Sequence, residues 1–169
     1  MLKKILLSLL FFLFFSSFSS SSFTKEINGV AIVIDGDTLK IKNEKIRLSG
    51  IDSPEIKQTC KKPYLTISFY TFFKNYNCGE ISKLKLKKYT KAKIVKCIFH
   101  SRDRYNRLIA ECYVDNKNIN SWMVKNGYAI AYRKYSKKFI SEEKYAKKHK
   151  LGLWQGIFIM PEKWRKNKK

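Results

Sequence analysis

Acidic residues are scarce in this sequence. Its 169 residues include 13 Asp and Glu against 36 Lys and Arg, which gives a formal net charge of +23 at pH 7. Such a charge attracts polyanions and disfavours self-association, so nucleic acid and anionic membrane surfaces are both candidate partners. A lysine-rich surface that reflects compositional bias alone is an equally open alternative. The lysines are spread along the whole chain, and charge by itself therefore indicates no chemistry.

Close pairs of potential zinc ligands are also absent. The four cysteines show no Cys-x-x-Cys spacing, and His100 and His149, the two histidines, lie far apart in the sequence. These absences argue against a zinc site of the usual kind. An even number of cysteines in an exported chain favours two disulfides instead.

The sequence lacks the run of about 20 apolar residues that a membrane-spanning helix needs. Its longest apolar run, Ile5 to Phe15, follows two lysines and precedes a serine-rich stretch. A basic start, a short apolar region and a small-residue region are the parts of a secretory signal peptide. We expect residues 1–22 to be a signal peptide, or alternatively a retained N-terminal anchor. The remainder is expected to be exported to the periplasm or outside the cell.

Short segments rich in β-branched residues alternate with turn residues in the rest of the chain. They predict strands at 29–34, 38–42, 46–51, 93–99 and 107–114. Helical patterns follow at 80–89, 119–126 and 141–150. No internal repeat occurs. Five short strands with about three helices indicate an α+β fold, for which the five-stranded OB-type β-barrel is the natural candidate.

The four cysteines allow three pairings. In a hairpin centred on residues 104–105, Cys97 and Cys112 fall opposite each other, which favours a disulfide between them. Cys60 and Cys78 would then pair. That bond would close a loop and constrain the unfolded chain by roughly 3 kcal/mol.

The segment between Cys60 and Cys78 is the hardest to interpret. Residues 56–77 are rich in aromatic side chains, and we expect a long loop or a partial helix tied at its base. A lid, a membrane-facing patch and a packed loop all stay open as roles of its aromatic part, residues 64–76.

Three carboxylates fall where the predicted strands turn. Asp37 begins the second strand, and Asp52 and Glu55 follow the third. In a meander these positions lie at one end of the sheet, so the three acids can converge on a site for Ca²⁺ or Mg²⁺, which prefer oxygen ligands. The alternative is that they are ordinary turn residues.

Two arginines stand out in a chain dominated by lysine. Arg47 lies on the third predicted strand and Arg107 begins the fifth. The planar guanidinium grips a phosphate through two hydrogen bonds, which lysine cannot do. A metal ion, a carboxylate base and two arginines are the parts that a phosphodiesterase needs. The alternative for each arginine is a surface ion pair.

The order of these motifs resembles the thermonuclease family, the staphylococcal nuclease-like domains, and in particular its small exported bacterial members. The resemblance runs from about Gly29 to Trp154, and we place the domain at residues 27–160. A basic C-terminal tail follows at 161–169 and is expected to end in a solvated cluster, Lys163 to Lys169. The motifs that carry the resemblance are Asp35-Gly-Asp-Thr38, Arg47-Leu-Ser-Gly-Ile-Asp52-Ser-Pro-Glu55, Asp103-Arg-Tyr-Asn-Arg107 and Leu151-Gly-Leu-Trp154.

The resemblance implies an OB-type barrel that binds one Ca²⁺ and hydrolyses DNA and RNA with little sequence preference. We also expect a monomer with no obligate protein partner, in contact with a membrane only through an uncleaved leader. Tyrosines are expected near the nucleotide because base stacking tolerates sequence. The implied residues are Asp37, Asp52 and the Ser53 carbonyl for the metal, Glu55 as general base, Arg47 and Arg107 for the phosphate, and Tyr105, Tyr132 and Tyr135 for the nucleotide.

Two positions depart from the family pattern. Ser53 replaces a threonine of the best-known member, which a backbone ligand should tolerate. Asn106 replaces the usual glycine. Because asparagine tolerates positive φ better than most residues, we expect Asn106 to have that conformation.

Two other functions compete with this interpretation. OB-type barrels often bind nucleic acid without cutting it, so a non-catalytic binding barrel is the first alternative. A cationic protein that acts on membranes is the second, but it leaves the acidic cluster unexplained.

Overall fold

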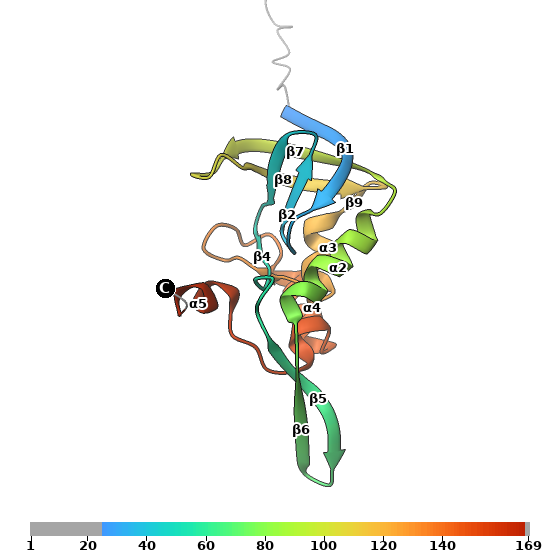
Figure 1. The fold of residues 1–169 in the computed structure, drawn as a ribbon, viewed down its shortest axis with the longest axis vertical. Coiled ribbons are helices and arrows are strands. Elements are labelled where there is room, and N and C mark those ends of the chain that lie inside the picture. Colours follow the sequence, from blue (N-terminus) through green and yellow to red (C-terminus); the bar gives the residue numbers. More distant parts are fainter. Residues whose placement is uncertain (1–24, 168–169) are drawn as a thin grey trace, which may run out of the picture.

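The computed structural model describes residues 25–167 of the chain, and the expected signal peptide at residues 1–22 lies outside them. The first three strands form the expected meander (Figure 1). A two-residue strand follows them. These strands are β1 (Lys25–Val33), β2 (Thr38–Ile41), β3 (Glu44–Leu48) and β4 (Ile51–Asp52).

Five strands close into a barrel. β7 (Ile94–Arg102) pairs with β1 on one side and with β8 (Leu108–Val114) on the other, and the short β9 (Lys117–Asn118) extends β8. The ring closes because β8 also pairs in parallel with β3. This closure confirms the OB-type barrel. The turn between β7 and β8 contains Asn106 with φ of 61°, as predicted.

The inward residues of the barrel are aliphatic and fully buried. Cys97 and Cys112 face each other across β7 and β8 and form a disulfide within this core. Cys60 and Cys78 form the second disulfide, so both favoured pairings are confirmed. The largest aliphatic side chains of the core are Leu39, Ile41, Ile46, Leu48 and Leu108.

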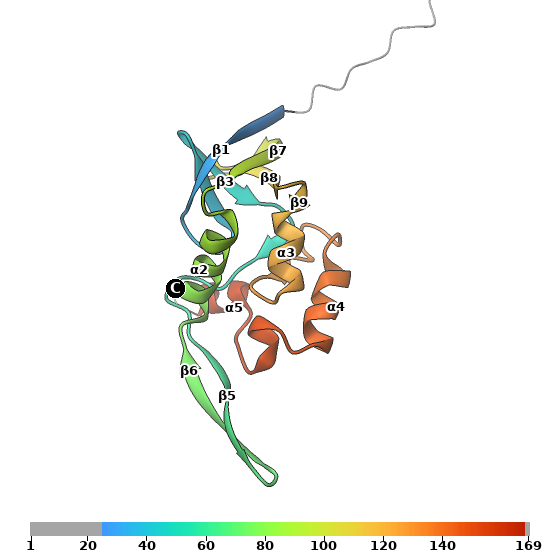
Figure 2. The same ribbon diagram turned by 90° about the vertical axis from the view of Figure 1, so that its right-hand side faces the viewer.

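Three helices of at least seven residues gather at one end of the barrel (Figure 2). They match the predicted helical patterns. Asn118 caps the second of them by accepting a hydrogen bond from the backbone N–H of Ser121. The helices are α2 (Cys78–Thr90), α3 (Ile119–Lys125) and α4 (Ile140–Lys148). The short strand β10 (Ile130–Ala131) lies between α3 and α4, and the 3₁₀ helix η1 (Gly152–Gln155) follows α4. Within residues 25–167, no helix is both long and apolar enough to cross a membrane.

The aromatic segment is neither a loop nor a partial helix, and that prediction was wrong. It forms a two-stranded antiparallel hairpin, β5 (Cys60–Ile67) and β6 (Tyr70–Tyr76), which projects from the body of the protein (Figure 1). Ser68 takes positive φ in its two-residue turn. Most side chains of both hairpin strands are exposed, so the sequence of the hairpin lacks the alternation of a half-buried strand.

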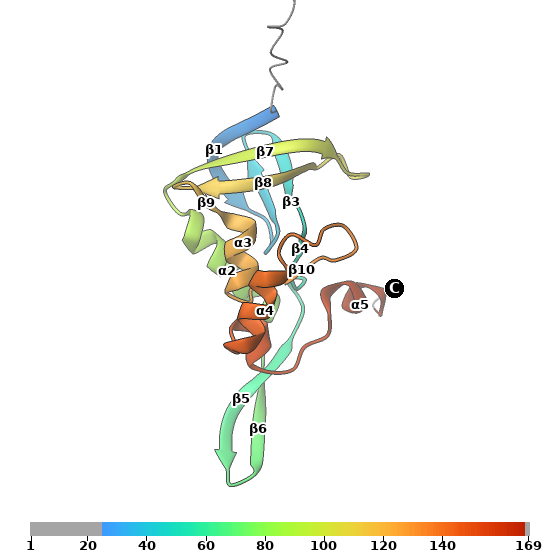
Figure 3. The ribbon, with the colours of Figure 1, turned by 180° about the vertical axis from the view of Figure 1, so that it is seen from behind.

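The expectation of a solvated tail was also wrong for its first residues. Helix α5 (Pro161–Lys166) begins with a proline at its first turn, where proline is favoured. The helix lies near β4 (Figure 3). Arg165 on this helix forms ion pairs with Asp52 and Glu55, and these opposite charges explain why the segment folds back onto the domain.

Glu143 on α4 gives the fold a pH-dependent contribution to stability. Its side chain is buried and pairs with Arg133 and Lys147. Burial alone would raise the pKa of Glu143, but the hydrogen bonds from these two partners outweigh it and lower the pKa below its ordinary value of 4.5. A carboxyl group with a lowered folded-state pKa stabilises the fold above its ordinary pKa, and this stabilisation is lost as the pH falls below it.

Replacing Glu143 with glutamine is therefore expected to lower the free energy of unfolding by about 1–2 kcal/mol at neutral pH. The deficit should shrink as the pH falls below 4.5, because the native carboxylate then becomes protonated as well. Urea unfolding of the wild type and of Glu143→Gln, from neutral pH to below 4.5, measures this difference in the free energy of unfolding. Glu142→Gln, the neighbouring substitution on α4, is the matched control. A deficit that stays constant with pH would contradict the assignment.

Candidate functional site

Two of the expected metal ligands lie together at one end of the meander. Asp37 precedes β2 and Asp52 ends β4, and both side chains are buried. Arg47 on β3 joins them: one guanidinium nitrogen contacts the carboxylate of Asp37, and Nη2 lies 3.0 Å from Oδ1 of Asp52. The two carboxylates are thus both within reach of one planar group.

Residue 53 lies against the same carboxylates. The backbone N–H of Ser53 donates to Oδ2 of Asp37 at 2.8 Å. The turn at Gly36 packs so closely here that a Cβ at this position would lie 2.7 Å from the hydroxyl of Ser53. The turn before β2 and the segment after β4 are therefore held together by both packing and a hydrogen bond.

Glu55 lies at the exposed edge of this cluster, and Arg165 links it to Asp52. Nη1 of Arg165 donates to Oε1 of Glu55 at 2.9 Å, and Nη2 donates to Oδ2 of Asp52 at 3.0 Å. Burial alone would lower the pKa of Arg165, but these hydrogen bonds outweigh it and raise the pKa above its ordinary value. Two guanidinium groups thus contact three carboxylates, which leaves one negative charge of the cluster uncompensated.

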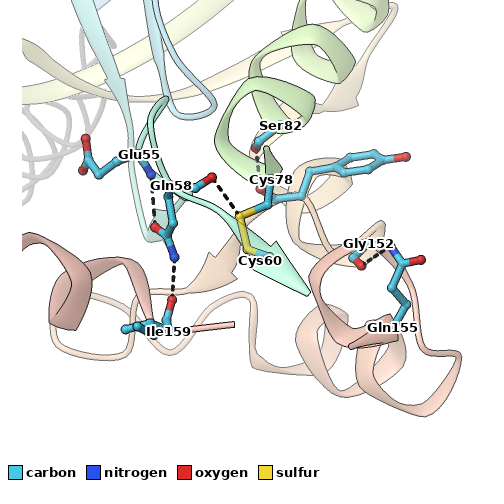
Figure 4. The surroundings of a disulfide bond; sticks show 9 residues. Glu55, Gln58, Cys60, Cys78, Ser82, Gly152, Gln155 and Ile159 are labelled. Carbon is cyan, nitrogen blue, oxygen red and sulfur yellow. Dashed lines mark hydrogen bonds between the residues drawn. A yellow bond between two sulfur atoms is a disulfide. The ribbon is translucent and has the colours of Figure 1, made fainter. Parts of the chain in front are cut away.

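The backbone around Glu55 is fixed by its neighbours (Figure 4). The buried side chain of Gln58 accepts a hydrogen bond from the N–H of Glu55 and donates one to the carbonyl of Ile159, just before α5. The first turn of α2 packs directly against the backbone of Glu55 at Gly79. Any other residue at this position would place its Cβ only 1.8 Å from the carbonyl oxygen of Glu55. Gln58 thus joins the Glu55 loop to the segment that carries Arg165.

The second expected phosphate ligand directly precedes β8, the strand that pairs with β3. Arg107 follows the β7–β8 turn, where its Nε donates to Oδ2 of Asp103 at 2.8 Å and its Nη2 lies 2.7 Å from the same atom. Burial alone would raise the pKa of Asp103, but hydrogen bonds from Arg107 and Tyr105 outweigh it and lower the pKa. Asp103 remains a carboxylate that orients Arg107.

Arg47 and Arg107 are brought close together by the pairing of β3 with β8, in which Ile46 lies opposite Leu108. Burial lowers the pKa of Arg47, and the positive charge of Arg107 lowers it further, against the raising effect of Asp52. Burial also raises the pKa of Asp35, while the Thr38 hydroxyl and both arginines lower it to a smaller extent. Asp35 borders the cluster, because its Oδ1 accepts a hydrogen bond from the backbone N–H of Asp37.

The three tyrosines expected near a nucleotide surround the cluster at different distances. Tyr105 is exposed beside Arg107, whose Cζ lies 5.4 Å from the ring centroid. Tyr132 and Tyr135 pack edge to face with centroids 4.8 Å apart. Tyr132 follows β10, in which Ile130 pairs with Asp52, and its N–H donates to the carbonyl of Gly50, whereas Tyr135 is 70% exposed.

The donor set suits a hard cation, although residues 25–167 contain no group of three or more His, Cys, Asp or Glu side chains arranged to hold a metal. Asp37 and Asp52 supply two carboxylates, and the third oxygen implied by the resemblance is a backbone carbonyl, that of Ser53. Buried carboxylates need a compensating positive charge. Oxygen ligands of this kind fit Ca²⁺.

Sequence reasoning gave no role to Asp103, Gln58 or Arg165. Asp103 was part of a recognised motif, and its spacing of four residues from Arg107 is a signal that could have shown the pair. Arg165 is an arginine in a lysine-rich segment, which is the signal that singled out Arg47 and Arg107. Gln58 carries no local signal, because its partner Ile159 lies 101 residues away.

Comparison with known proteins agrees with this geometry. A family model described as staphylococcal nuclease homologue matches residues 45–156. The succinoglycan biosynthesis protein ExoI of Rhizobium meliloti is 33% identical over 132 residues, which cover 76% of this chain and 65% of that protein. An uncharacterized endonuclease of Haemophilus influenzae is 33% identical over 159 residues, covering 89% and 79%. One of Escherichia coli is 31% identical over 152 residues, covering 85% and 88%. The chain thus spans less than two thirds of the Rhizobium protein but most of both endonucleases.

Proposed function

Because the chain belongs to the family of staphylococcal nuclease homologues, we propose that it is a calcium-dependent endonuclease that hydrolyses phosphodiester bonds of DNA and RNA with little sequence preference. The observation that carries the proposal is the cluster in which Asp37, Asp52 and Glu55 meet two guanidinium groups. A barrel that only binds nucleic acid needs cations and aromatic rings, but no buried carboxylates.

The roles follow from the placement of each side chain. Glu55 is the member of the acidic cluster with substantial exposure, at 40% of its side chain, so it can accept a proton from an attacking water. Arg47 on β3 and Arg107 just before β8 lie near each other, because these two strands pair, and they present planar donors to a phosphate. They stabilise the negative charge that grows on the phosphoryl oxygens in the transition state.

Asp37, Asp52 and the carbonyl of Ser53 would hold the calcium ion. Bound there, Ca²⁺ would polarise a phosphoryl oxygen and offset its charge. Ser53 is buried and its N–H already donates to Asp37, which fixes the orientation of that carboxylate. The protein contribution is thus a pair of carboxylates positioned before any ligand arrives.

Arg165 is expected to compete with calcium for the carboxylate of Asp52. Replacing Arg165 with glutamine removes a positive charge from Asp52 and Glu55, and Ca²⁺ should then bind about three- to tenfold more tightly, as expected for a partly exposed ion pair. Calorimetric titration of the protein with CaCl₂, without nucleic acid, measures this affinity.

Lys166→Gln is the matched control, because Lys166 lies on the same helix and pairs with Glu162 outside the cluster. Its calcium affinity should equal that of the wild type. Equal affinities for all three proteins would show that Arg165 does not oppose the ion.

Location outside the cytosol forms part of the proposal. The two disulfides support it, because such bonds persist in oxidising compartments such as the periplasm and the extracellular space. The net charge of +23 supports a polyanionic substrate and disfavours self-association, so we propose that the protein acts as a monomer.

Substrate breadth is tested with equal molar amounts of duplex DNA, single-stranded DNA and RNA of unrelated sequences, each with Ca²⁺. Cleavage of all of them at many positions is expected. Restriction of cleavage to one kind of nucleic acid or to one sequence would contradict the proposed breadth. Binding without cleavage of any substrate would favour the non-catalytic barrel instead.

A further inference from the structure

The β5–β6 hairpin exposes more apolar surface than any function at the carboxylate cluster requires. It projects away from the rest of the protein in all three views (Figures 1, 2 and 3). Phe69 in its turn is 97% exposed and Tyr70 is 76% exposed. Contiguous apolar surface of this kind marks an interaction site. The other exposed apolar side chains of the hairpin are Tyr64, Leu65, Ile67, Phe72 and Phe73.

The strand register separates the two faces of the hairpin. Ile67 pairs with Tyr70 and Leu65 pairs with Phe72, and because side chains alternate along a strand, these four share one face. The opposite face carries Thr66 and Thr71, whose hydroxyls lie 3.2 Å apart. The outer half of the hairpin therefore has an apolar face and a turn with Phe69 at its end.

Charge is confined to the base of the hairpin. Residues 63–73 contain no charged side chain, and no acidic residue occurs between Glu55 and Glu80. Lys62 and Lys74 pair across the strands at the point where the uncharged part begins. Lys57 and Lys61 precede them in the chain. The uncharged end of the hairpin, residues 63–73, thus lies beyond four lysines at its base, Lys57, Lys61, Lys62 and Lys74, which we call the lysine collar.

The base of the hairpin is fixed to the domain. The Cys60–Cys78 disulfide ties its first strand to the start of α2. Lys61 and Ile157 exchange two backbone hydrogen bonds of 2.8 and 2.9 Å, which join the same strand to the segment before α5. These links hold the hairpin in its extended position, so little order remains to be gained when it binds a partner.

We propose that this hairpin docks the protein onto an anionic lipid bilayer, with the uncharged end in the interfacial region and the lysine collar at the headgroups. Aromatic side chains favour the membrane interface, and each lysine near an anionic surface contributes about 1 kcal/mol. The outer five residues of each strand span about 16 Å, enough to reach the 5–10 Å depth of interfacial binding.

Two alternative partners, a second copy of the chain and single-stranded nucleic acid, fit the hairpin less well than a bilayer does. A second copy of the chain would bring together two proteins of net charge +23, which repel each other. Single-stranded nucleic acid needs cations beside the stacking rings. Lys74 lies 4.7 Å from the Tyr64 ring, but residues 65–73 contain no cation, and Leu65 and Ile67 have no ring on which a base can stack. The proposal does not depend on nuclease activity.

Sedimentation with vesicles tests the proposal in the presence of a chelator. The full chain should bind vesicles of phosphatidylglycerol and phosphatidylcholine in equal parts, and bind phosphatidylcholine alone at least tenfold more weakly. Phe69→Ser with Phe72→Ser should weaken binding to the mixed vesicles at least about tenfold, since each buried phenylalanine contributes more than one factor of ten. Val30→Ser with Ile32→Ser, equally exposed on β1, should leave it unchanged.

Lys62→Gln with Lys74→Gln should weaken binding more than Lys87→Gln with Lys88→Gln, which removes the same charge from α2. A tryptophan at position 69 reports on the hairpin itself. Because the wild type already has three tryptophans, brominated lipids should quench the emission of Phe69→Trp more than that of the wild type if the hairpin enters the bilayer. The proposal would be overturned if brominated lipids quenched Phe69→Trp no more than the wild type. It would also be overturned if Phe69→Ser with Phe72→Ser bound the mixed vesicles as tightly as the wild type does. The proposal would likewise be overturned if Phe69→Ser with Phe72→Ser abolished binding of single-stranded DNA, or abolished a dimer, while vesicle binding stayed intact.

Discussion

Glu55→Gln is expected to lower the rate of phosphodiester cleavage by about 10²–10⁴-fold, the usual contribution of a general base. Glutamine keeps the shape of the side chain and can still accept a hydrogen bond from Arg165, but it cannot take a proton from water. Single-turnover cleavage of a labelled duplex with saturating Ca²⁺ measures the chemical step directly.

Two further readouts separate this role from a structural one. The affinity of Glu55→Gln for uncleaved DNA and its midpoint of thermal unfolding should stay close to those of the wild type, because Glu55 lies at the exposed edge of the cluster. Glu80→Gln, an acidic residue in the first turn of α2, is the matched control and should cleave normally. Cleavage by Glu55→Gln within a fewfold of the wild-type rate would remove Glu55 from the chemistry.

Arg107→Lys is expected to lower turnover by about 10²-fold while retaining the positive charge. Lysine lacks the planar fork that binds two phosphate oxygens at once, and removal of one preorganised donor in a transition state commonly has this effect. The structure adds that Asp103 holds Arg107 by two nitrogens, an orientation that an ammonium group cannot reproduce.

The loss should appear mainly in the rate of the chemical step rather than in the affinity for nucleic acid, because the net charge is unchanged. Arg102→Lys is the matched control, since Arg102 lies five residues earlier and forms an exposed pair with Glu44. Equal effects of the two substitutions would show that Arg107 contributes only charge.

Local patterns in the sequence predicted most of the barrel and the acidic side of the site. Strand alternation and turn residues determine where the meander ends, and Asp37 and Asp52 occupy those ends, so their proximity follows from topology. The Cys97–Cys112 bond follows from hairpin register in the same way. These predictions depend on residues close in sequence or on neighbouring strands.

The failures involve contacts that no local pattern encodes. Arg165 lies 110 residues beyond Glu55, and nothing near it in sequence shows that α5 folds back onto the carboxylates. The β5–β6 hairpin buries little of its surface, so its residues lack the period that a packed strand imposes. Its disulfide was predicted, whereas its secondary structure was not.

The central claim is that Asp37 and Asp52 hold a calcium ion needed for cleavage by the cluster that includes Glu55 and Arg107. Cleavage of supercoiled plasmid by the full chain, followed as CaCl₂ is titrated against a chelator, tests it most directly. We expect nicked and then degraded plasmid with free Ca²⁺, and intact plasmid when the chelator is in excess. Cleavage at the same rate without free calcium, or no cleavage at any calcium concentration, would contradict the account.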